Sequence, residues 1–240
     1  MNIKNDLIGA MVSEDFRTAA VFKKFGIDFC CKGNRTIEDA CADKGIDQNK
    51  VYSELENLPK SGNENIDFTS WPLDLLADYV EKTHHRYVKE KSPVIFAFLE
   101  KLCNVHGGRH PELFEIKDLF SESIQDLGDH MVKEETILFP FIRTMVDAKN
   151  SNTDFERPHF GSVENPVNMM MHEHTAEGER FEKISALSNA YTVPDDGCNT
   201  YRVAFQMIQE FEDDLHKHIH LENNILFPKS VHLEKDFQTV

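Results

Sequence analysis

The sequence predicts an all-α protein with a C-terminal up-and-down four-helix bundle over residues 72–240 and a small helical domain over residues 1–60. No segment of strand length alternates apolar and polar residues, and from Trp71 onward apolar residues recur at helical spacing. A short motif also occurs twice, because HMVKEETILFP at 130–140 and HIHLENNILFP at 218–228 match at six positions. The duplication indicates two related pairs of helices, a pattern that suits a bundle.

The first 60 residues indicate three short helices with few large apolar side chains. Ser13 is expected to cap a first helix that ends near Gly26. A capping box that begins at Thr36 opens the second helix, which Gly45 ends, and the third covers Gln48–Leu58. A unit of this size is only marginally stable alone. We therefore expect it to dock on the rest of the chain or to form a homodimer.

Four long helices follow a polar linker at residues 59–70, which carries glycine and proline. Pro93 is expected to bend the first of them. The longest connection joins the second helix to the third and is rich in asparagine, serine, glycine and proline. The predicted helices cover residues 72–103, 111–148, 167–190 and 199–231.

The composition argues against several classes of function. A net charge of −16 opposes binding to nucleic acid or to an anionic membrane. No run of about 18 apolar residues could span a bilayer, and the N-terminus lacks the apolar segment of a secretory signal. Five cysteines, an odd number without a regular framework, fit a reducing compartment. We therefore expect a cytoplasmic protein, and its twelve histidines favour metal handling.

Each copy of the repeated motif places a histidine and a glutamate one helical turn apart, as His130 with Glu134 and His218 with Glu222. These residues continue the apolar stripe of their helices, so we expect them to face the core. A carboxylate in a core is costly unless it is paired or bound to a metal. Imidazole and carboxylate are donors that iron accepts, so the motif predicts a metal site. The stripe of the first copy reads Ile124, Leu127, His130, Glu134, Ile137 and Phe141.

The other two long helices each place one histidine on an apolar stripe, and these are His84 and His174. His85 is rotated by about 100° from its neighbour and is expected to face outward. His172 falls on a polar face of its helix. The intervals from the two selected histidines to the repeated motifs are similar, at 46 and 44 residues, which supports a duplicated helix pair.

Four histidines and two glutamates suit a pair of metal ions. Each ion would receive two imidazoles and one oxygen from each bridging glutamate, and an oxo or hydroxo bridge would make five ligands. The sixth position of an octahedron would be open to a small molecule such as O₂ or NO. The alternative is that the histidines are hydrogen-bonded packing residues. The predicted ligands are His84, His130, Glu134, His174, His218 and Glu222.

Other reactive side chains have two interpretations each. Asp126 and Glu173 could orient the ligands or carry protons, or they are solvated surface acids. The adjacent Cys30 and Cys31 could bind metal, transfer nitrosyl groups or exchange thiols, or one packs in the small domain while the other is partly exposed. Histidines of the connections, including His106, are expected to be exposed. The remaining cysteines are interpreted as structural or incidental, and these are Cys41, Cys103 and Cys198.

Several motifs occur together along nearly the whole chain. They are the segment 25–34 with its adjacent cysteines, Thr83-His84, His130-x-x-x-Glu134, Glu173-His174, and His218-x-x-x-Glu222-Asn-Asn-Ile-Leu-Phe-Pro. In this combination the chain resembles the bacterial repair-of-iron-centres family, whose C-terminal domain is similar to hemerythrins. The resemblance implies a non-haem di-iron centre held by the six predicted ligands. It also implies a role in restoring iron–sulfur clusters damaged by nitric oxide or oxidants, by delivering iron or handling NO, with damaged iron–sulfur proteins as partners.

One position departs from the pattern of the oxygen-carrying hemerythrins, which have five histidines and a His-x-x-x-His motif on the third helix. Here Gly178 follows His174 by four residues. The missing imidazole favours labile iron or NO chemistry over reversible O₂ carriage. Two alternatives stay open, namely a carrier or sensor of O₂ or NO, and an enzyme that reduces NO at the metal pair.

Overall fold

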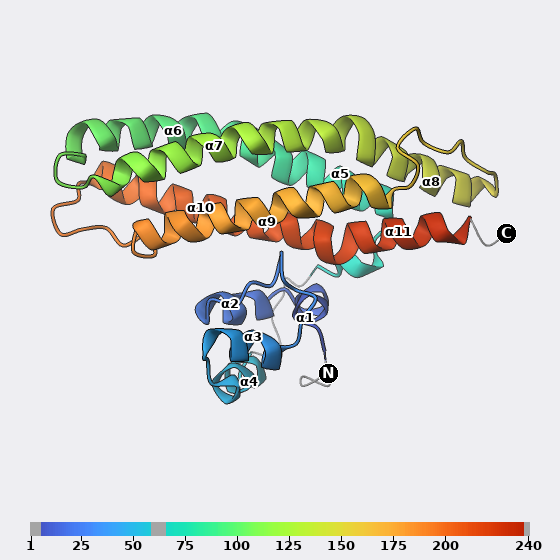
Figure 1. The fold of residues 1–240 in the computed structure, drawn as a ribbon, viewed down its shortest axis with the longest axis horizontal. Helices are drawn as coiled ribbons and strands as arrows, with labels where there is room; N and C mark the ends of the chain where they lie inside the picture. Colours follow the sequence, from blue (N-terminus) through green and yellow to red (C-terminus); the bar gives the residue numbers. More distant parts are fainter. Residues whose placement is uncertain (1–5, 59–65, 238–240) are drawn as a thin grey trace. The chain divides into compact units, whose positions relative to one another are not determined.

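The computed structural model describes residues 6–58 and 66–237, which form helices joined by turns and loops (Figure 1). Within these ranges the only β-type pairing is an isolated bridge between Leu7 and Thr36, so the all-α prediction is confirmed. The chain divides into two compact units. The first combines the described residues up to Leu76 with those from Ile219 onward, and the second covers Ala77–His218.

Between residues 6 and 58 the first unit contains four helices where three were predicted. The first predicted helix corresponds to α2 but begins later, at Thr18, and the unpredicted α1 precedes it. Between them the carboxylate of Asp15 accepts a hydrogen bond from the backbone N–H of Arg17 at 3.0 Å. Ser13 does not cap a helix but lies inside one. Thr36 caps as predicted, because its Oγ1 accepts from the backbone N–H of Asp39 at 3.2 Å. The four helices are α1 (Ile8–Glu14), α2 (Thr18–Lys24), α3 (Ile37–Lys44) and α4 (Gln48–Glu56).

These helices dock on the C-terminal segment of the same unit. That segment consists of the π-helical turn η4 (Glu222–Leu226) and helix α11 (Phe227–Asp236). The side-chain amides of Asn223 and Asn224 donate to the backbone carbonyl of Cys30, at 3.2 and 3.3 Å. The rings of Phe16 and Phe29 also contact the ring of His220, with centroids 5.8 and 6.0 Å apart. The predicted linker is described only from residue 66, since residues 59–65 lie outside the described ranges.

Long helices run side by side in the second unit (Figure 1). Phe120, Phe181 and Phe211, from three different helices, meet in its core, with ring centroids 5.3 Å apart for the first and third and 5.8 Å apart for the second and third. Pro93 lies inside a helix that continues past it. No helix among the described residues combines the length and apolarity needed to cross a lipid bilayer. The helices are α5 (Leu73–Tyr79), α6 (Arg86–His106), α7 (Glu112–Lys133), α8 (Phe139–Ser151), α9 (Glu164–Leu187) and α10 (Asn199–Leu221), of which α5 and α10 each extend across a boundary of the units.

Three π-helical turns interrupt the described helices, and each contains or adjoins a predicted ligand. Besides η4, they are η2 (Val80–His85) and η3 (Glu134–Leu138). A π turn holds more residues than an α turn, so it changes which residues within the turn and after it face the core. The predicted stripe is therefore wrong at one position, because Ile137 is 40 % exposed whereas its neighbour Leu138 is 1 % exposed.

Two glycines of the first unit approach each other too closely for a side chain. The backbone N–H of Gly9 donates to the carbonyl of Gly33 at 2.8 Å. A Cβ on Gly33 would lie 2.5 Å from the backbone oxygen of Phe29 and 2.9 Å from the Cα of Gly9. Because both obstacles are backbone atoms, neither can rotate away.

We expect Gly33→Ala to lower the free energy of unfolding by about 1–3 kcal/mol, through overpacking, as measured by urea denaturation. Gly128→Ala is the control, because a Cβ at that helical position would meet no atom within 4 Å. It should raise the free energy of unfolding by about 0.5–1 kcal/mol, since alanine favours helix over glycine. Similar changes in both variants would contradict the close approach.

Candidate metal centre

Six buried side chains from η2, α7, η3, α9, α10 and η4 supply candidate metal ligands, and each is at most 2 % exposed. Their ligand atoms form two groups, and within each group all lie within 4.8 Å of one another. One group contains His85 and His218, and the other contains His130 and His174. The same two carboxylates, Glu134 and Glu222, belong to both groups.

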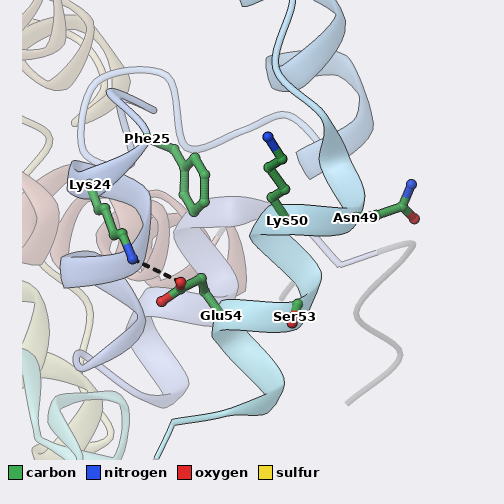
Figure 2. Close-up of a pocket in the computed structure, with 6 residues that line it drawn as sticks. All are labelled: Lys24, Phe25, Asn49, Lys50, Ser53 and Glu54. Carbon is green, nitrogen blue, oxygen red and sulfur yellow. Dashed lines mark hydrogen bonds and ion pairs between the residues drawn. The ribbon is translucent and has the colours of Figure 1, made fainter.

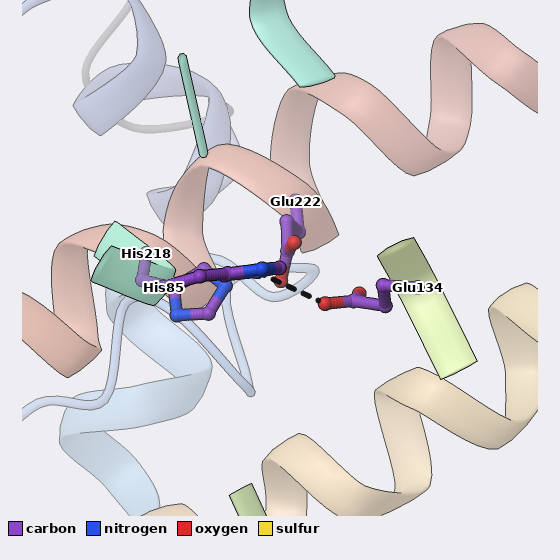
Figure 3. Close-up of side chains that lie close together, drawn as sticks. All are labelled: His85, Glu134, His218 and Glu222. Carbon is purple, nitrogen blue, oxygen red and sulfur yellow. Dashed lines mark ion pairs between the residues drawn. The ribbon is translucent and has the colours of Figure 1, made fainter. Parts of the chain in front are cut away.

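Glu134 lies between the imidazoles of two helices. Its Oε2 is 3.3 Å from Nε2 of His85 and 3.2 Å from Nε2 of His130. Figure 3 shows the His85 ring directed at this carboxylate, with Glu222 and His218 beside it. Nε2 of His174 lies 3.1 Å from Nε2 of His130. The site thus concentrates imidazole nitrogens and carboxylate oxygens in a volume without contact to solvent.

Acidic side chains orient two of these imidazoles through their Nδ1 atoms. Nδ1 of His130 lies 2.8 Å from Glu173 and Nδ1 of His85 lies 2.9 Å from Glu135. The hydrogen bond from His130 lowers the pKa of Glu173 to about 2. Burial alone would raise the pKa of Glu135, but hydrogen bonds from Lys89 and His85 lower it. Both carboxylates are therefore ionised at neutral pH and accept the Nδ1 protons.

This arrangement fits a metal ion. When Nδ1 of a neutral imidazole donates its proton to a carboxylate, Nε2 carries a lone pair. The Nε2 atoms of His85 and His130 then both direct lone pairs at the Glu134 carboxylate. Such donors repel one another unless a cation lies among them. Carboxylate–histidine–metal chains of this kind are the usual way in which metal ligands are oriented.

His85, and not His84, joins the cluster, which corrects the sequence-based expectation. Counting in α-helical turns from Val80 selects His84, but the wider turn of η2 brings His85 to the core face as well. His85 is fully buried instead of facing outward. His84 is also buried, but its Nδ1 lies 2.9 Å from Asp214 and its ring stacks on His218 with centroids 5.6 Å apart.

The two acids considered as partners of the ligands have different surroundings. Glu173 contacts His130 and also forms an ion pair with Lys133. Asp126 pairs instead with Arg180, whose Nη2 lies 2.6 Å away, and the side chain of Asp126 is 59 % exposed. The orienting role is therefore supported for Glu173, and the surface role for Asp126.

The adjacent cysteines form a third candidate group, within the first unit. The carboxylate of Asp28 accepts hydrogen bonds from the backbone N–H groups of Cys30 and Cys31, at 3.0 and 2.9 Å. The two sulfur atoms lie 3.7 Å apart. The hydrogen bond with Cys31 and burial raise the pKa of Cys30 well above its ordinary value. Cys30 is thus a protonated thiol at neutral pH, and the thiol role of the pair stays a prediction.

An open hollow between α2 and α4 does not contain any of the predicted ligands (Figure 2). An ion pair between Lys24 and Glu54, at 2.8 Å, lies along one side of it. Both side chains are about half exposed, so this feature is interpreted as ordinary polar surface. Its lining residues are Lys24, Phe25, Asn49, Lys50, Ser53 and Glu54.

Sequence reasoning missed His85 and Glu135. For Glu135 a signal existed, because it adjoins a predicted ligand just as Glu173 adjoins His174. For His85 the pairing with Glu135 would have required knowledge of the π turn. No feature of the sequence that we used marks such a turn, because it is set by packing around the site.

We expect His85→Ala to remove the metal held by its group, whereas His84→Ala should keep the metal content close to that of the unmodified protein. Both residues are buried, so the pair controls for loss of packing. The measurement is elemental analysis after reconstitution with ferrous iron and removal of free metal. Loss of metal from the His84 variant alone would favour the original assignment.

Comparisons with known proteins agree with this geometry. A domain of unknown function named ScdA_N matches residues 4–59, and the hemerythrin HHE cation binding domain matches residues 77–230. The iron–sulfur cluster repair protein ScdA of Staphylococcus haemolyticus is 28 % identical over 95 % of this chain and 99 % of its own length. The iron–sulfur cluster repair protein YtfE of Musicola paradisiaca is 30 % identical over 96 % of this chain and 98 % of its own. That of Yersinia pseudotuberculosis is also 30 % identical, over 96 % and 99 %.

Both domains of the chain and its near-full-length similarity to these relatives point to one group. The hemerythrin HHE domain covers more than half of the residues. The chain belongs to the hemerythrin-like family of iron–sulfur cluster repair proteins.

Proposed function

We propose that this protein holds two iron ions and uses them in the repair of damaged iron–sulfur clusters. The observation that carries the proposal is that Glu134 and Glu222 belong to both ligand groups. One ion would be held by His85 and His218, the other by His130 and His174, and the two carboxylates would bridge them. This is the ligand count expected from the sequence, with His85 in place of His84.

The donor set suits iron. Imidazole and carboxylate together suit iron, zinc and copper, whereas magnesium and calcium prefer oxygen donors alone. Structural zinc sites are closed and tetrahedral, whereas two shared carboxylates in two neighbouring groups suit a dinuclear centre. Iron bound here would supply redox chemistry and open coordination positions for small ligands such as NO or O₂.

The outer acids and their lysines suggest how iron could reach or leave the site. Glu173 and Glu135 lie behind two of the ligands, with side chains 28 % and 23 % exposed. Their partners Lys133 and Lys89 are more exposed, at 38 % and 52 %. Each imidazole is therefore fixed by an acid that solvent can reach. Breaking the hydrogen bond between either acid and its imidazole would leave that ring free to rotate. We therefore infer that iron passes, as cargo, beside Glu173 and beside Glu135.

The named function of the relatives supports the cellular role. ScdA and YtfE are named iron–sulfur cluster repair proteins, so we propose damaged iron–sulfur proteins as partners of this chain. A cytoplasmic location and a homodimer stay predictions from the sequence. Light scattering on the purified protein would test the dimer, and a monomeric mass would contradict it.

We expect Glu173→Gln to weaken iron binding by about 10- to 100-fold, because the amide no longer attracts the Nδ1 proton of His130 and the imidazole is a poorer ligand. Asp126→Asn is the matched control, since that acid pairs with Arg180. Competition with a ferrous chelator measures both affinities. Equal affinities for the two variants would contradict the orienting role of Glu173.

We expect the iron-loaded protein to restore the activity of an enzyme whose iron–sulfur cluster has been damaged by NO. Glu134→Leu should fail, because it removes a carboxylate shared by both groups. Asp126→Asn should repair as the unmodified protein does. Recovered enzyme activity and the visible spectrum of the cluster are the measurements. Equal rescue by Glu134→Leu would refute the proposed function.

A further inference from the structure

A cysteine–histidine pair connects the ends of α6 and α10. Cys198 directly precedes α10, and His106 is the last residue of α6. The Sγ of Cys198 lies 3.3 Å from Nε2 of His106. Cys198 is exposed, whereas His106 is only 5 % exposed. The expected exposure of His106 is therefore corrected, because its side chain is buried.

The surroundings of Cys198 favour the thiolate. The hydrogen bond from His106 and those from the backbone N–H groups of Tyr201 and Thr200 lower the pKa of Cys198 to about 7. These N–H groups belong to the first turn of α10, where the helix dipole also favours negative charge. A thiolate is the nucleophilic form of cysteine.

The burial of His106 favours one tautomer of its imidazole ring. Its Nδ1 is buried and has no hydrogen-bond partner, and Tyr201 covers the ring edge-on at a centroid distance of 5.4 Å. A proton on Nδ1 would be a buried donor without an acceptor, which is costly. The tautomer with its proton on Nε2 avoids this cost, and it donates to the sulfur of Cys198, which acts as the acceptor.

Other charged groups around the pair are already matched with one another. His110 lies 2.9 Å from Asp196 and 3.0 Å from Glu112, and Asp196 also pairs with Arg109 at 2.8 Å. The hydrogen bond to Asp196 raises the pKa of His110. The partners of Asp196 thus offset its negative charge, which lies two residues from Cys198 in the chain.

The other four cysteines differ from Cys198 in exposure or in acidity. Cys30, Cys41 and Cys103 are buried, and their pKa values are raised, chiefly by the Cys31 sulfur for the first and by burial for the other two. Cys31 is partly exposed. Cys198 alone combines full exposure with a histidine donor.

We propose that Cys198 and His106 form a thiol–disulfide exchange site that reacts with low-molecular-weight disulfides such as glutathione disulfide. The Cys198 thiolate attacks one sulfur of the disulfide, and a new S–S bond forms as the old one breaks. The other half leaves as a thiolate and takes a proton from water. Cys198 is oxidised to the mixed disulfide while the leaving half is reduced, so the electrons balance.

This site is separate from the candidate metal centre. Cys198 directly precedes α10 and His218 lies 20 residues further along the chain, within α10, which corresponds to about 30 Å of helix. Cys198→Ser should therefore leave the iron content unchanged. Failure of the exchange reaction would not bear on iron binding, and failure of iron binding would not bear on the exchange.

The test measures the rate of mixed-disulfide formation on the iron-loaded protein with glutathione disulfide, by intact mass, between pH 6 and pH 10. We expect one adduct, absent in Cys198→Ser and present in Cys31→Ser. The rate should rise with pH through a midpoint near 7, the pKa of Cys198. An adduct on Cys31 instead, or a midpoint near the ordinary value of about 8.5, would overturn the proposal.

His106→Leu tests the role of the histidine. Loss of the donor should move the midpoint towards about 8.5. At pH 7 the variant should then react about threefold more slowly, because fewer molecules carry a thiolate. Above pH 9 it should react about fivefold faster, because a thiolate of higher pKa is the better nucleophile. An unchanged pH profile would refute the pairing.

If the His106→Leu variant does not fold, the pH profile of the unmodified protein is measured in urea instead. An unchanged midpoint in urea would equally refute the pairing.

Discussion

The structure depends on two carboxylates, Glu134 and Glu222, buried among four imidazoles. Removing a carboxylate from water is costly unless its charge is balanced. Imidazoles from four helical segments meet these carboxylates at one level, where a bound cation would balance the negative charge, so the helices must place their ligands together. The acids behind His85 and His130 then fix which ring nitrogen faces inward. A binding site for cations thus determines the interior of the bundle as much as apolar packing does.

Most of this could be predicted from the sequence because it follows from local periodicity. His130, Glu134, His174, His218 and Glu222 each continue an apolar stripe, and the structure buries all five. The remaining position failed because the prediction assumed 3.6 residues per turn throughout. The same assumption misplaced Ile137, which is exposed within η3. A π turn is tolerated where tertiary interactions compensate for its geometry, and such interactions are not encoded in the spacing of one helix.

The cysteines show a second limit of sequence reasoning. The adjacent pair attracted attention because two thiols stand side by side, whereas Cys198 is isolated in the sequence. In the structure the neighbouring Cys31 sulfur and burial keep Cys30 protonated, whereas His106 favours the thiolate of Cys198. The acidity of Cys198 depends on a contact with His106, which lies 92 positions away in the chain. A local sequence motif cannot indicate such a contact.

The hydrogen bonds from Asn223 and Asn224 to the Cys30 carbonyl have a consequence for the order of folding. During synthesis the N-terminal helices leave the ribosome well before the segment from Ile219 onward on which they dock. They cannot complete their packing until that segment has emerged. A nascent chain that stalls before residue 219 would therefore lack the amide donors of the Cys30 carbonyl, and the loop that carries Cys30 and Cys31 would form without these contacts.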